Sequence, residues 1–376
     1  MAGKGLNQEI HLGDISKLFT KKTKKAPKEK AFKPRDVVAF DIGTKTTKVV
    51  EGRYTNSKIL VYNMFEFPTP EGAIDDGKIT NEKDLVDTIK ANLKKNMVKA
   101  KEAIVTTSSS TIISRDIVIP VVADDEMETV IRYEIEQYLP IKLDDYIIQF
   151  TVLDRLVEAD GEKYKVNVVS YPKITASGYY DLLTKLDLTP LILDVNYNSL
   201  RKLIQHCGIN NNGGTVAFVD MGATSINVTI FNQGKLDFTR IIKYGGDSID
   251  YALSTKLDMS IKSTESEKIE KADLKDIGEY DVLNNALKET MDEILGELER
   301  ILQFYNNQSL SNKIDKVIIY GGTSNIGGLE SYMEEKSGIK TEKITTLNNV
   351  KFEARKKVRV NTLGDYANVI GSFIRL

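Results

Sequence analysis

One short pattern occurs twice in this sequence and constrains its fold more than any other feature. Residues 37–54 read VVAFDIGTKTTKVVEGRY, an apolar strand that ends in an Asp-x-Gly turn and returns at once as a second strand. Residues 214–246 repeat this order, with Asp220 and Gly222 in the turn, and add a hairpin and a third strand. The repeat predicts two related halves, each built on a meander of antiparallel strands.

The segments around the two copies alternate between strand and helix patterns. After a further strand at residues 58–67, Leu85 and Ile89 lie four residues apart behind Asn81, a good N-cap, and predict a helix. Residues 108–172 follow another order, strand, helix, strand, strand, which is typical of a small inserted unit. We therefore expect an α/β protein. Its expected parts are a flexible basic arm at 1–35, a first half at 36–107 and 173–208, an inserted βαββ subdomain at 108–172, and a second half at 209–376.

The charge of the chain is balanced overall but uneven locally. Lys and Arg total 52 and Asp and Glu total 54, so the net charge of −2 gives no chain-wide reason to expect nucleic acid as a partner. Between Lys17 and Arg35, however, nine residues are basic and only Glu29 is acidic. This arm is predicted to be a solvated linker, with peripheral contact to anionic lipid as the alternative.

Cysteine and hydrophobic content bear on location. Cys207 is the single cysteine, which excludes an internal disulfide framework and favours a reducing compartment such as the cytoplasm. No apolar run approaches the roughly 18 residues that span a bilayer. The two histidines, His11 and His206, lie in the arm and near a predicted helix end, so they indicate neither a metal site nor a catalytic triad.

The two turns carry residues suited to phosphate and Mg²⁺. Glycine in a tight turn lets the backbone approach a ligand closely and point several N–H groups at one spot, a geometry that binds phosphate. Two such turns predict a polyphosphate held from both sides. Asp41 and Asp220, at the strand ends, are then candidates to hold Mg²⁺, which takes one or two carboxylates together with phosphate oxygens and water. Lys48, on the strand after the first turn, supplies a positive charge.

A third segment points to the rest of a nucleotide. Residues 317–333 read VIIYGGTSNIGGLESYM, an apolar strand that ends in Gly321-Gly322-Thr323 and opens a helix. Backbone without side chains at this place leaves room for a flat base and its ribose. A Gly-Gly pair after a strand is a weak signal alone, and it gains weight from the two turns before it.

These three segments, in this order, resemble the phosphate loops and the adenosine loop of the actin-like ATPase superfamily. That superfamily includes actin, heat-shock chaperone ATPases, sugar kinases and the division protein FtsA. The resemblance implies an ATP and Mg²⁺ site, with Lys48 touching phosphate and Glu267 in place of a ribose-contacting carboxylate. The residues implied to bind the nucleotide are Gly43, Thr44, Lys45, Thr46, Lys48, Gly222, Ala223, Thr224, Glu267, Gly321, Gly322 and Thr323, with Asp41 and Asp220 at the metal.

Within the superfamily the layout is similar to the PilM family of type IV pilus assembly. The features that support this are the βαββ insertion with IEQYLPI at residues 135–141, GGDSID at residues 245–250, and the ending ANVIGSFIRL. The resemblance implies an ATP-binding scaffold that binds the N-terminal cytoplasmic tail of a PilN-like membrane protein beside the insertion. Through that tail it would connect to the pilus platform and motor, at the inner face of the cell membrane.

The chain departs from the superfamily pattern at Asn196, where related proteins tend to carry an acid. A neutral amide cannot act as a general base for water, so we expect ATP binding with weak or absent hydrolysis and assign no catalytic residue. Asp194, two residues earlier, is either a substitute base or a helix cap. Tyr133, Tyr138 and Leu139 in the insertion are either core residues or part of an exposed peptide groove.

Two other functions fit the same superfamily. An FtsA-like division or cytoskeletal protein shares the insertion type, but that family usually ends in an amphipathic membrane helix after a linker. A small-molecule kinase needs a catalytic acid in a substrate cleft, and the insertion stands where it would form an interaction surface instead. We therefore rank the pilus scaffold first, the FtsA-like protein second and the kinase last.

Overall fold

A computed structural model describes residues 10–12, 34–55, 57–139, 142–159, 161–209, 213–275, 281–308, 313–353 and 360–374. The chain divides into two compact units, which are described separately. The first comprises Met1–Lys202, Lys351–Lys356 and Val369–Leu376, and the second comprises Leu203–Val350 and Lys357–Asn368. The predicted second half ran unbroken from 209 to 376, whereas two short C-terminal segments group with the first unit. No helix in the described ranges has both the length and the apolar character needed to cross a membrane.

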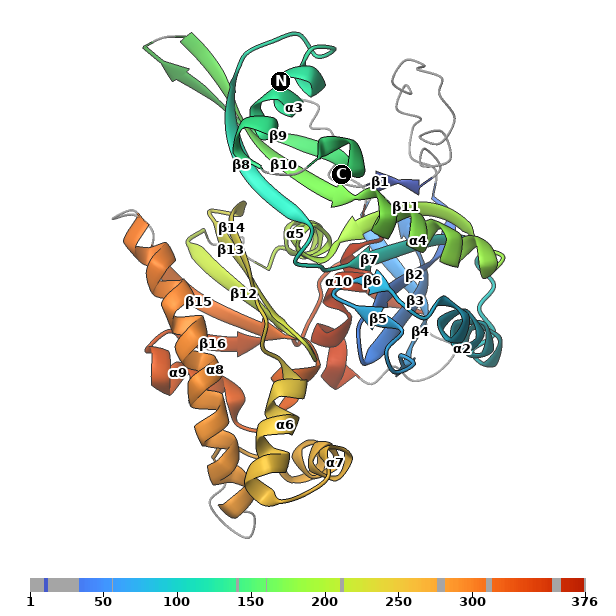
Figure 1. The fold of residues 1–376 in the computed structure, drawn as a ribbon, viewed down its shortest axis with the longest axis vertical. Helices are drawn as coiled ribbons and strands as arrows, with labels where there is room; N and C mark the ends of the chain where they lie inside the picture. The colour runs from blue at the N-terminus through green and yellow to red at the C-terminus, as the bar shows by residue number, and fades with distance from the viewer. Residues whose placement is uncertain are drawn as a thin grey trace. The chain divides into compact units, whose positions relative to one another are not determined.

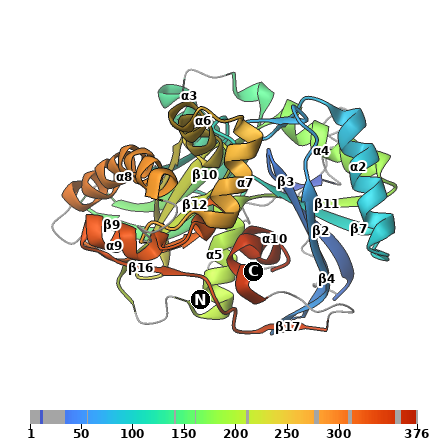
Figure 2. The ribbon, with the colours of Figure 1, turned by 90° about the horizontal axis from the view of Figure 1, so that it is seen from below.

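The first unit is built on a seven-stranded sheet (Figure 1). Its strands, in spatial order, are β1 (Ile10–His11), β11 (Thr189–Val195), β7 (Glu102–Thr107), β2 (Asp36–Ile42), β3 (Thr46–Thr55), β4 (Lys58–Pro68) and β17 (Val350–Phe352). The β2, β3 and β4 strands form the predicted antiparallel meander, while β7 runs parallel to both β2 and β11. Figure 2 shows β17 along β4 at one edge of this sheet.

Helices complete the core of this unit. They are α2 (Glu82–Lys95) and α4 (Lys173–Lys185), while α5 (Asn196–Cys207) follows β11, and a small hairpin, β5 (Ile74–Asp75) and β6 (Lys78–Ile79), precedes α2. The predicted cap is present, because Asn81 Oδ1 accepts a hydrogen bond from the Asp84 backbone N–H at 3.3 Å. Leu85 and Ile89 are fully buried in the cluster that also contains Phe40 and Val105 from the sheet, as the four-residue spacing predicts.

The inserted segment forms a sheet of its own, with strand order β8-β10-β9 and antiparallel pairing throughout. Its elements are β8 (Ile113–Pro120), α3 (Met127–Tyr138), a short 3₁₀ helix η1 (Leu143–Asp145), β9 (Tyr146–Glu158) and β10 (Gly161–Pro172). Ile131 and Ile135 of α3 are buried against Phe150 and Val166 of the strands. The predicted βαββ order is therefore confirmed (Figure 1), and this subdomain has a separate hydrophobic core.

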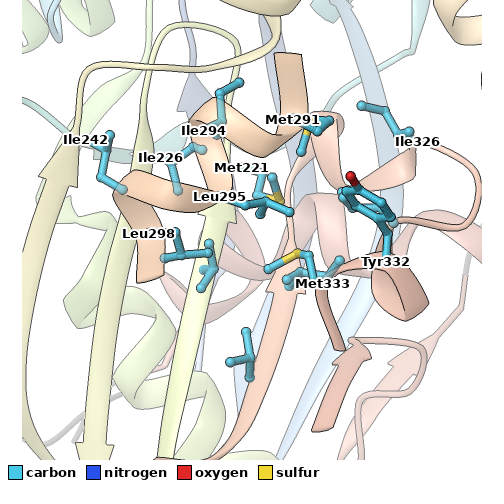
Figure 3. Close-up of a cluster of buried hydrophobic side chains, with 14 of the residues drawn as sticks. Met221, Ile226, Ile242, Met291, Ile294, Leu295, Leu298, Ile326, Tyr332 and Met333 are labelled. Atoms are coloured by element: carbon cyan, nitrogen blue, oxygen red, sulfur yellow. The ribbon is translucent and has the colours of Figure 1, made fainter. Parts of the chain in front are cut away.

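The second unit contains a five-stranded sheet. Its strands, in spatial order, are β14 (Lys235–Ile242), β13 (Ile226–Asn232), β12 (Thr215–Met221), β15 (Ile314–Tyr320) and β16 (Lys340–Lys343). Its helices are α6 (Gly246–Leu257), α7 (Ile261–Lys271), α8 (Asp281–Gln308), η2 (Gly322–Asn325) and α9 (Leu329–Ser337). The spacing of apolar residues over about 280–307 predicts a long helix with one apolar stripe, and in α8 this stripe, including Met291, Ile294 and Leu298, is buried against strand residues such as Ile226 (Figure 3).

Two predictions near the chain ends were wrong. The sequence GDYANVIGSFIRL at residues 364–376 predicts one final helix, but the chain forms a 3₁₀ helix, η3 (Val360–Tyr366), and then a short α10 (Ala367–Gly371). A Cβ on Gly364 would lie 3.2 Å from the backbone oxygen of Ile344, so close packing of the backbone shapes this segment. In the N-terminal arm, Ile10–His11 is not a flexible linker but an edge strand, because Ile10 and Leu12 are buried. The remainder of the arm up to residue 33 lies outside the described residues.

Candidate functional site

The first turn joins β2 to β3 and has the tight geometry that its glycine predicts. The Gly43 N–H donates to the Thr46 carbonyl at 3.1 Å, and Thr44 and Lys45 lie between them. Asp41 and Lys48 are direct partners in the antiparallel β2–β3 pair. Side chains of directly opposed residues emerge on the same face of a sheet, so Asp41 and Lys48 project from one face of the β2–β3 pair, beside the turn.

A threonine that sequence reasoning missed holds this turn in place. The Thr69 hydroxyl donates to the Gly43 carbonyl at 2.8 Å, and it also shares a 2.8 Å hydrogen bond with the Thr47 hydroxyl. The Thr69 backbone N–H donates to the Lys45 carbonyl at 2.8 Å. Thr69 lies just after β4, and no local sequence pattern connects that position with the turn.

The strands parallel to β2 bring two more polar residues to its end. Thr106 on β7 is the register partner of Asp41, and its hydroxyl donates to Asn196 Oδ1 at 2.8 Å. Burial, together with the negative charge of Asp41, raises the pKa of Tyr179 to about 12, although a hydrogen bond with Thr107 acts in the opposite direction. The neutral Tyr179 hydroxyl donates to the Gly77 carbonyl at 2.8 Å. The first unit therefore groups Asp41, Thr106 and Asn196 at the carboxyl ends of adjacent strands.

Asp194 is a structural residue, which decides between the two roles left open by the sequence. Its carboxylate and the Lys202 ammonium group are both fully buried and lie 2.7 Å apart. Asn198 and Ser199 each donate a further 2.7 Å hydrogen bond to it. Burial raises the pKa of Asp194, but the Lys202 charge and these hydrogen bonds outweigh it and hold the pKa below its ordinary value. A carboxylate with these partners fastens the start of α5 through its side chains and is not placed to accept a proton from water.

The second turn joins β12 to β13 and repeats the first. The Gly222 N–H donates to the Ser225 carbonyl at 3.0 Å, with Ala223 and the exposed Thr224 between them. Asp220 is buried, and its Oδ2 accepts a 2.8 Å hydrogen bond from the Asn368 side-chain amide, a contact that the sequence did not predict.

Three glycine-containing segments meet at this second turn. The Thr323 hydroxyl donates to the Gly222 carbonyl at 2.9 Å, which joins the predicted adenosine segment to the turn. The Gly246 N–H donates to the same carbonyl at 3.0 Å, and the Asp247 N–H donates to the Ala223 carbonyl at 2.8 Å. Hydrogen bonds within the second unit therefore join the turn at Gly222 to Thr323 of the predicted adenosine segment and to the Gly246 segment.

On α7 the residue next to the predicted one faces the glycine segments. Lys268 Nζ lies 2.5 Å from Asp250 Oδ1 and donates to the Gly246 carbonyl at 3.3 Å, with its side chain only 9% exposed. Glu267, the predicted ribose contact, instead pairs with Lys271 at 2.8 Å one turn along the helix and is about one-third exposed. The structure thus brings Lys268, and not Glu267, into contact with the loops. Sequence spacing on a charged helix does not by itself distinguish two neighbouring residues.

The loops of the second unit pack so closely that two positions require glycine. A Cβ on Gly246 would lie 2.8 Å from Thr323 Oγ1, and one on Gly321 would lie 2.5 Å from Asp220 Oδ1, so backbone without side chains lines this place. Gly321 also has φ +88°, a conformation that favours glycine. Beside Asp220, Asn368 Oδ1 is buried and has no hydrogen-bond partner among the described residues. A hydrated cation or a ligand hydroxyl would satisfy such an acceptor.

A complete protein cage for a metal is not found in the described ranges, where no group of three or more His, Cys, Asp or Glu side chains is placed to hold an ion. A Mg²⁺ ion at either aspartate would therefore take phosphate oxygens and water as its other ligands, the usual arrangement for this ion with nucleotides.

Several other residues are placed by the structure. Tyr133 and Tyr138 of α3 are 65% and 56% exposed, so they belong to the surface, while Leu139 is half-buried against the core of the insertion. The Arg115 guanidinium lies 5.2 Å from the centre of the Tyr138 ring. Cys207 is buried, and burial raises the pKa of its thiol to about 12, which leaves it protonated and unreactive.

Solved structures with this arrangement share the actin-like ATPase fold. A type IV pilus biogenesis complex of PilM and PilN contains a chain with a TM-score of 0.76, 21% identity, and coverage of 90% of this chain and 99% of that one. The ethanolamine utilization protein EutJ from Carboxydothermus hydrogenoformans has a TM-score of 0.52, 11% identity, and coverage of 92% and 91%. MreB5 of Spiroplasma citri bound to AMPPNP has a TM-score of 0.50, 11% identity, and coverage of 90% and 95%.

These likenesses confirm the predicted fold class, two related actin-like halves with an inserted subdomain. The model of the type IV pilus assembly protein PilM family matches residues 39–369, from the first strand of the meander to the last helix. Because this match covers most of the sequence, the chain belongs to the PilM family of type IV pilus assembly.

Proposed function

We propose that this protein is an ATP-binding scaffold of type IV pilus assembly. The observation that carries the proposal is the meeting of three glycine-containing segments around Gly222, Gly246 and Thr323, on the fold of a pilus-assembly family. Segments of this kind offer backbone N–H groups to phosphates and an open surface to a base. One solved likeness, MreB5 of Spiroplasma citri, is bound to the nucleotide analogue AMPPNP, and this supports a nucleotide as the ligand of the fold.

Within this proposal each predicted residue has a defined task. The turn residues after Asp41 and Asp220 offer backbone N–H groups to the phosphates, Lys48 adds a positive charge, and Gly321–Thr323 leaves room for the adenosine. The two aspartates bind Mg²⁺ directly or through its waters, and the ion neutralises phosphate charge when bound. Lys268 holds the Gly246 segment by its hydrogen bond to the Gly246 carbonyl.

Hydrolysis is proposed to be weak or absent. Asn196 lies at the strand end next to Thr106 and Asp41, where an acid would activate water, and an amide cannot take that proton. Asp194 is held in its ion pair with Lys202. Bound nucleotide then acts as a ligand that stabilises one conformation of the chain, and so changes the affinity for a protein partner.

The proposed partner is the N-terminal cytoplasmic tail of a PilN-like membrane protein. Support comes from the PilM family match and from the solved complex of PilM and PilN, in which the likeness to this protein extends over 99% of the matched chain. We place the tail on the first unit beside the inserted subdomain. Through the tail the protein is held at the inner face of the cell membrane and connected to the pilus platform and motor.

Calorimetry of the full chain with Mg-ATP tests the nucleotide site. We expect micromolar or tighter binding, and a loss of at least about tenfold in affinity for Asp220→Asn, since a hydrogen bond or ion contact to a charged group contributes about 1.5–3 kcal/mol. The loss should shrink when EDTA removes Mg²⁺. Asp181→Asn, on the exposed face of α4, serves as the control and should leave affinity unchanged. Unchanged affinity in Asp220→Asn would contradict the assignment.

The proposed lack of hydrolysis has its own test in Asn196→Asp. The Thr106 hydroxyl that donates to Asn196 would donate equally to the new carboxylate and hold it in the same place. A positioned general base contributes about 10²- to 10⁴-fold to a rate. We therefore expect phosphate release from ATP to rise above the wild-type rate, and rapid hydrolysis by the wild-type protein would refute the proposal.

Pull-down from mildly solubilised cells with Mg-ATP present, followed by mass spectrometry, tests the partner. Recovery of a single-span membrane protein with a short cytoplasmic tail, together with pilus proteins, is the expected result. Recovery of division proteins alone, or of metabolic enzymes alone, would leave the nucleotide site in place but contradict the pilus role.

A further inference from the structure

The N-terminal segment of the chain adds a strand to the edge of the first unit's sheet. Ile10 pairs with Leu193 and His11 with Ile192, antiparallel to β11 (Figure 1). Ile10 is buried and His11 is exposed in the two-residue strand, and the next residue, Leu12, is in helical conformation and is buried as well. A short stretch of the arm is therefore bound to the unit in the way that an extended peptide binds a sheet edge.

The place that receives this segment lies where the large sheet meets the inserted subdomain. Ile10 and Leu12 share one hydrophobic cluster with Leu193 of β11 and with Ile147 and Tyr171, which belong to strands β9 and β10 of the insertion. Without β1, the β11 strand would be the edge of the sheet, with unpaired backbone groups along it. Sheet edge and apolar side-chain sites together make a surface for an extended peptide of apolar–polar–apolar pattern.

The segment is joined to this surface by short pairing only. The β1 strand spans two residues, and residues 12–35 separate it from the first strand of the meander. Because the segment belongs to the same chain as its site, its effective concentration there is higher than that of a free peptide. Burial of two apolar side chains favours binding of the segment, and the entropy lost in ordering three residues opposes it with a free energy of similar size. The segment can therefore exchange with a competing peptide.

We propose that the β11 edge is a strand-addition site which residues 10–12 occupy in cis, and that they regulate access for the extended cytoplasmic tail of the membrane partner. The identity of that partner rests on the proposed function above. The tail binds with its own apolar, polar, apolar residues in the positions of Ile10, His11 and Leu12, and it must first displace them. The arm thereby sets a threshold for partner binding.

The size of the effect follows from how often the segment occupies the site. A segment bound about nine-tenths of the time lowers the apparent affinity of a competitor about tenfold. Releasing it should therefore tighten partner binding by about that factor, while leaving Mg-ATP affinity unchanged in the absence of the partner.

The first test uses full-length variants and two fluorescent peptides. Leu12→Asp places a charge at a fully buried position and should expel the segment, whereas His11→Asp changes the exposed residue between the buried ones and is the matched control. The probes are the cytoplasmic tail of the PilN-like partner and LNQEIHLGD, a copy of residues 6–14 of this chain. We expect Leu12→Asp to bind both about tenfold more tightly than the wild type does, and His11→Asp to behave like the wild type.

The two probes separate the two ideas. Binding of the LNQEIHLGD copy to Leu12→Asp, with no binding of the partner tail to any variant, would support the strand-addition site but refute the proposed partner. Equal binding of the partner tail to the wild type and to Leu12→Asp would refute the regulation while leaving the proposed function intact.

A covalent lock provides the converse test without a buried charge. Ile10 and Leu193 face each other across the strand pair, so Ile10→Cys with Leu193→Cys should form a disulfide on mild oxidation. The native Cys207 is buried and should not interfere. We expect the oxidised protein to lose binding of both peptides and to regain it on reduction. Unchanged binding by the locked protein, or a disulfide that forms only between two molecules, would overturn the proposal.

Discussion

The two sheets of this protein share one design. Strands β4-β3-β2-β7-β11 of the first unit and β14-β13-β12-β15-β16 of the second follow the same spatial order, with two antiparallel pairs followed by two parallel pairs. Their turns agree closely, since the glycine N–H to carbonyl distances are 3.1 Å at Gly43 and 3.0 Å at Gly222. The difference lies in the residues that the neighbouring strands bring to each turn.

Beside the first turn the neighbours are polar side chains. Asp41 is opposed by Lys48 and is next to Thr106. Beside the second turn, Asp220 is opposed by Asn227 and is next to Tyr320, after which Gly321 follows. The aspartate at the first turn is thus next to a lysine and a threonine on adjacent strands, whereas the one at the second turn is next to an asparagine and a tyrosine, with glycine backbone following. The comparison teaches that a repeated turn supplies the shape of a site, while the adjacent strand ends supply its chemistry.

In this comparison of the two units, the largest effect is expected from breaking the buried ion pair of the first unit. Lys202→Met leaves the Asp194 carboxylate buried without its cation, and removal of one partner of such a pair costs about 3–5 kcal/mol. We expect hydrogen exchange to rise in peptides of the first unit and to stay near its wild-type rate in the strands of the second. Equal loss of protection in both units would contradict a local role.

The same variant has a defined pH dependence. In the folded wild type the pKa of Asp194 lies below its ordinary value because Lys202 and the hydrogen bonds outweigh burial. The stability from this group is therefore present above about pH 4, its ordinary range, and is lost as pH falls through the lowered folded value. The deficit of Lys202→Met should shrink in acid, because a protonated Asp194 needs no cation. Lys185→Met, which removes an exposed pair with Glu82, should cost at most about 1 kcal/mol at any pH.

A smaller effect is expected from the backbone of the second unit. In Gly321→Ala the new Cβ meets Asp220 Oδ1 at 2.5 Å in a conformation with φ +88°. Strain of this kind costs about 1–3 kcal/mol, and displacement of Asp220 should also weaken Mg-ATP binding. Gly322→Ala is the matched control, since its Cβ meets nothing within 4 Å and its stability should change by no more than about 0.5 kcal/mol. Urea denaturation and calorimetry measure both, and equal losses in the two variants would refute the strain argument.

The smallest effects test whether the turns are equivalent. A Cβ on Gly43 would lie 2.9 Å from the Thr46 carbonyl oxygen, and one on Gly222 would lie 3.0 Å from that of Ser225. Each turn must shift by a few tenths of an ångström, so Gly43→Ala and Gly222→Ala should each cost about 1 kcal/mol. Thermal unfolding, with hydrogen exchange as a second measurement, gives the loss of stability in each variant. A difference larger than about 1 kcal/mol would show that the turns are not equivalent, although a threonine hydroxyl donates to the glycine carbonyl in each.

Sequence reasoning predicted what local patterns encode. The strands around both turns, the Asn81 cap and the apolar stripe of α8 follow from alternation, capping chemistry and helical period, and all were confirmed. The contact between Thr323 and the second turn agrees with the order of the three predicted segments. The nucleotide- and metal-binding roles of these residues stay predictions until ligand binding is measured.

The missed features depend on contacts between distant segments. Ile10–His11 is a strand only because β11 offers an edge, and nothing in a basic arm indicates a two-residue strand. Lys268 faces the loops, and its neighbour Glu267 does not, because α7 is oriented by its packing rather than by its own charge pattern. Asn368 reaches Asp220 across almost 150 residues of sequence, a separation of 148 that no local motif spans.

The buried thiol of Cys207 is a natural probe of local unfolding in this protein. Asn348 donates a hydrogen bond to the Cys207 carbonyl, so this helix end is fastened to a distant loop of the same unit. Burial raises the pKa of the thiol to about 12, so the sulfur does not react with alkylating reagents in the folded chain. It regains ordinary reactivity whenever that region unfolds locally. The rate at which the native chain gains the mass of one alkyl group therefore measures the rate of local opening in this region, without any mutation or attached dye.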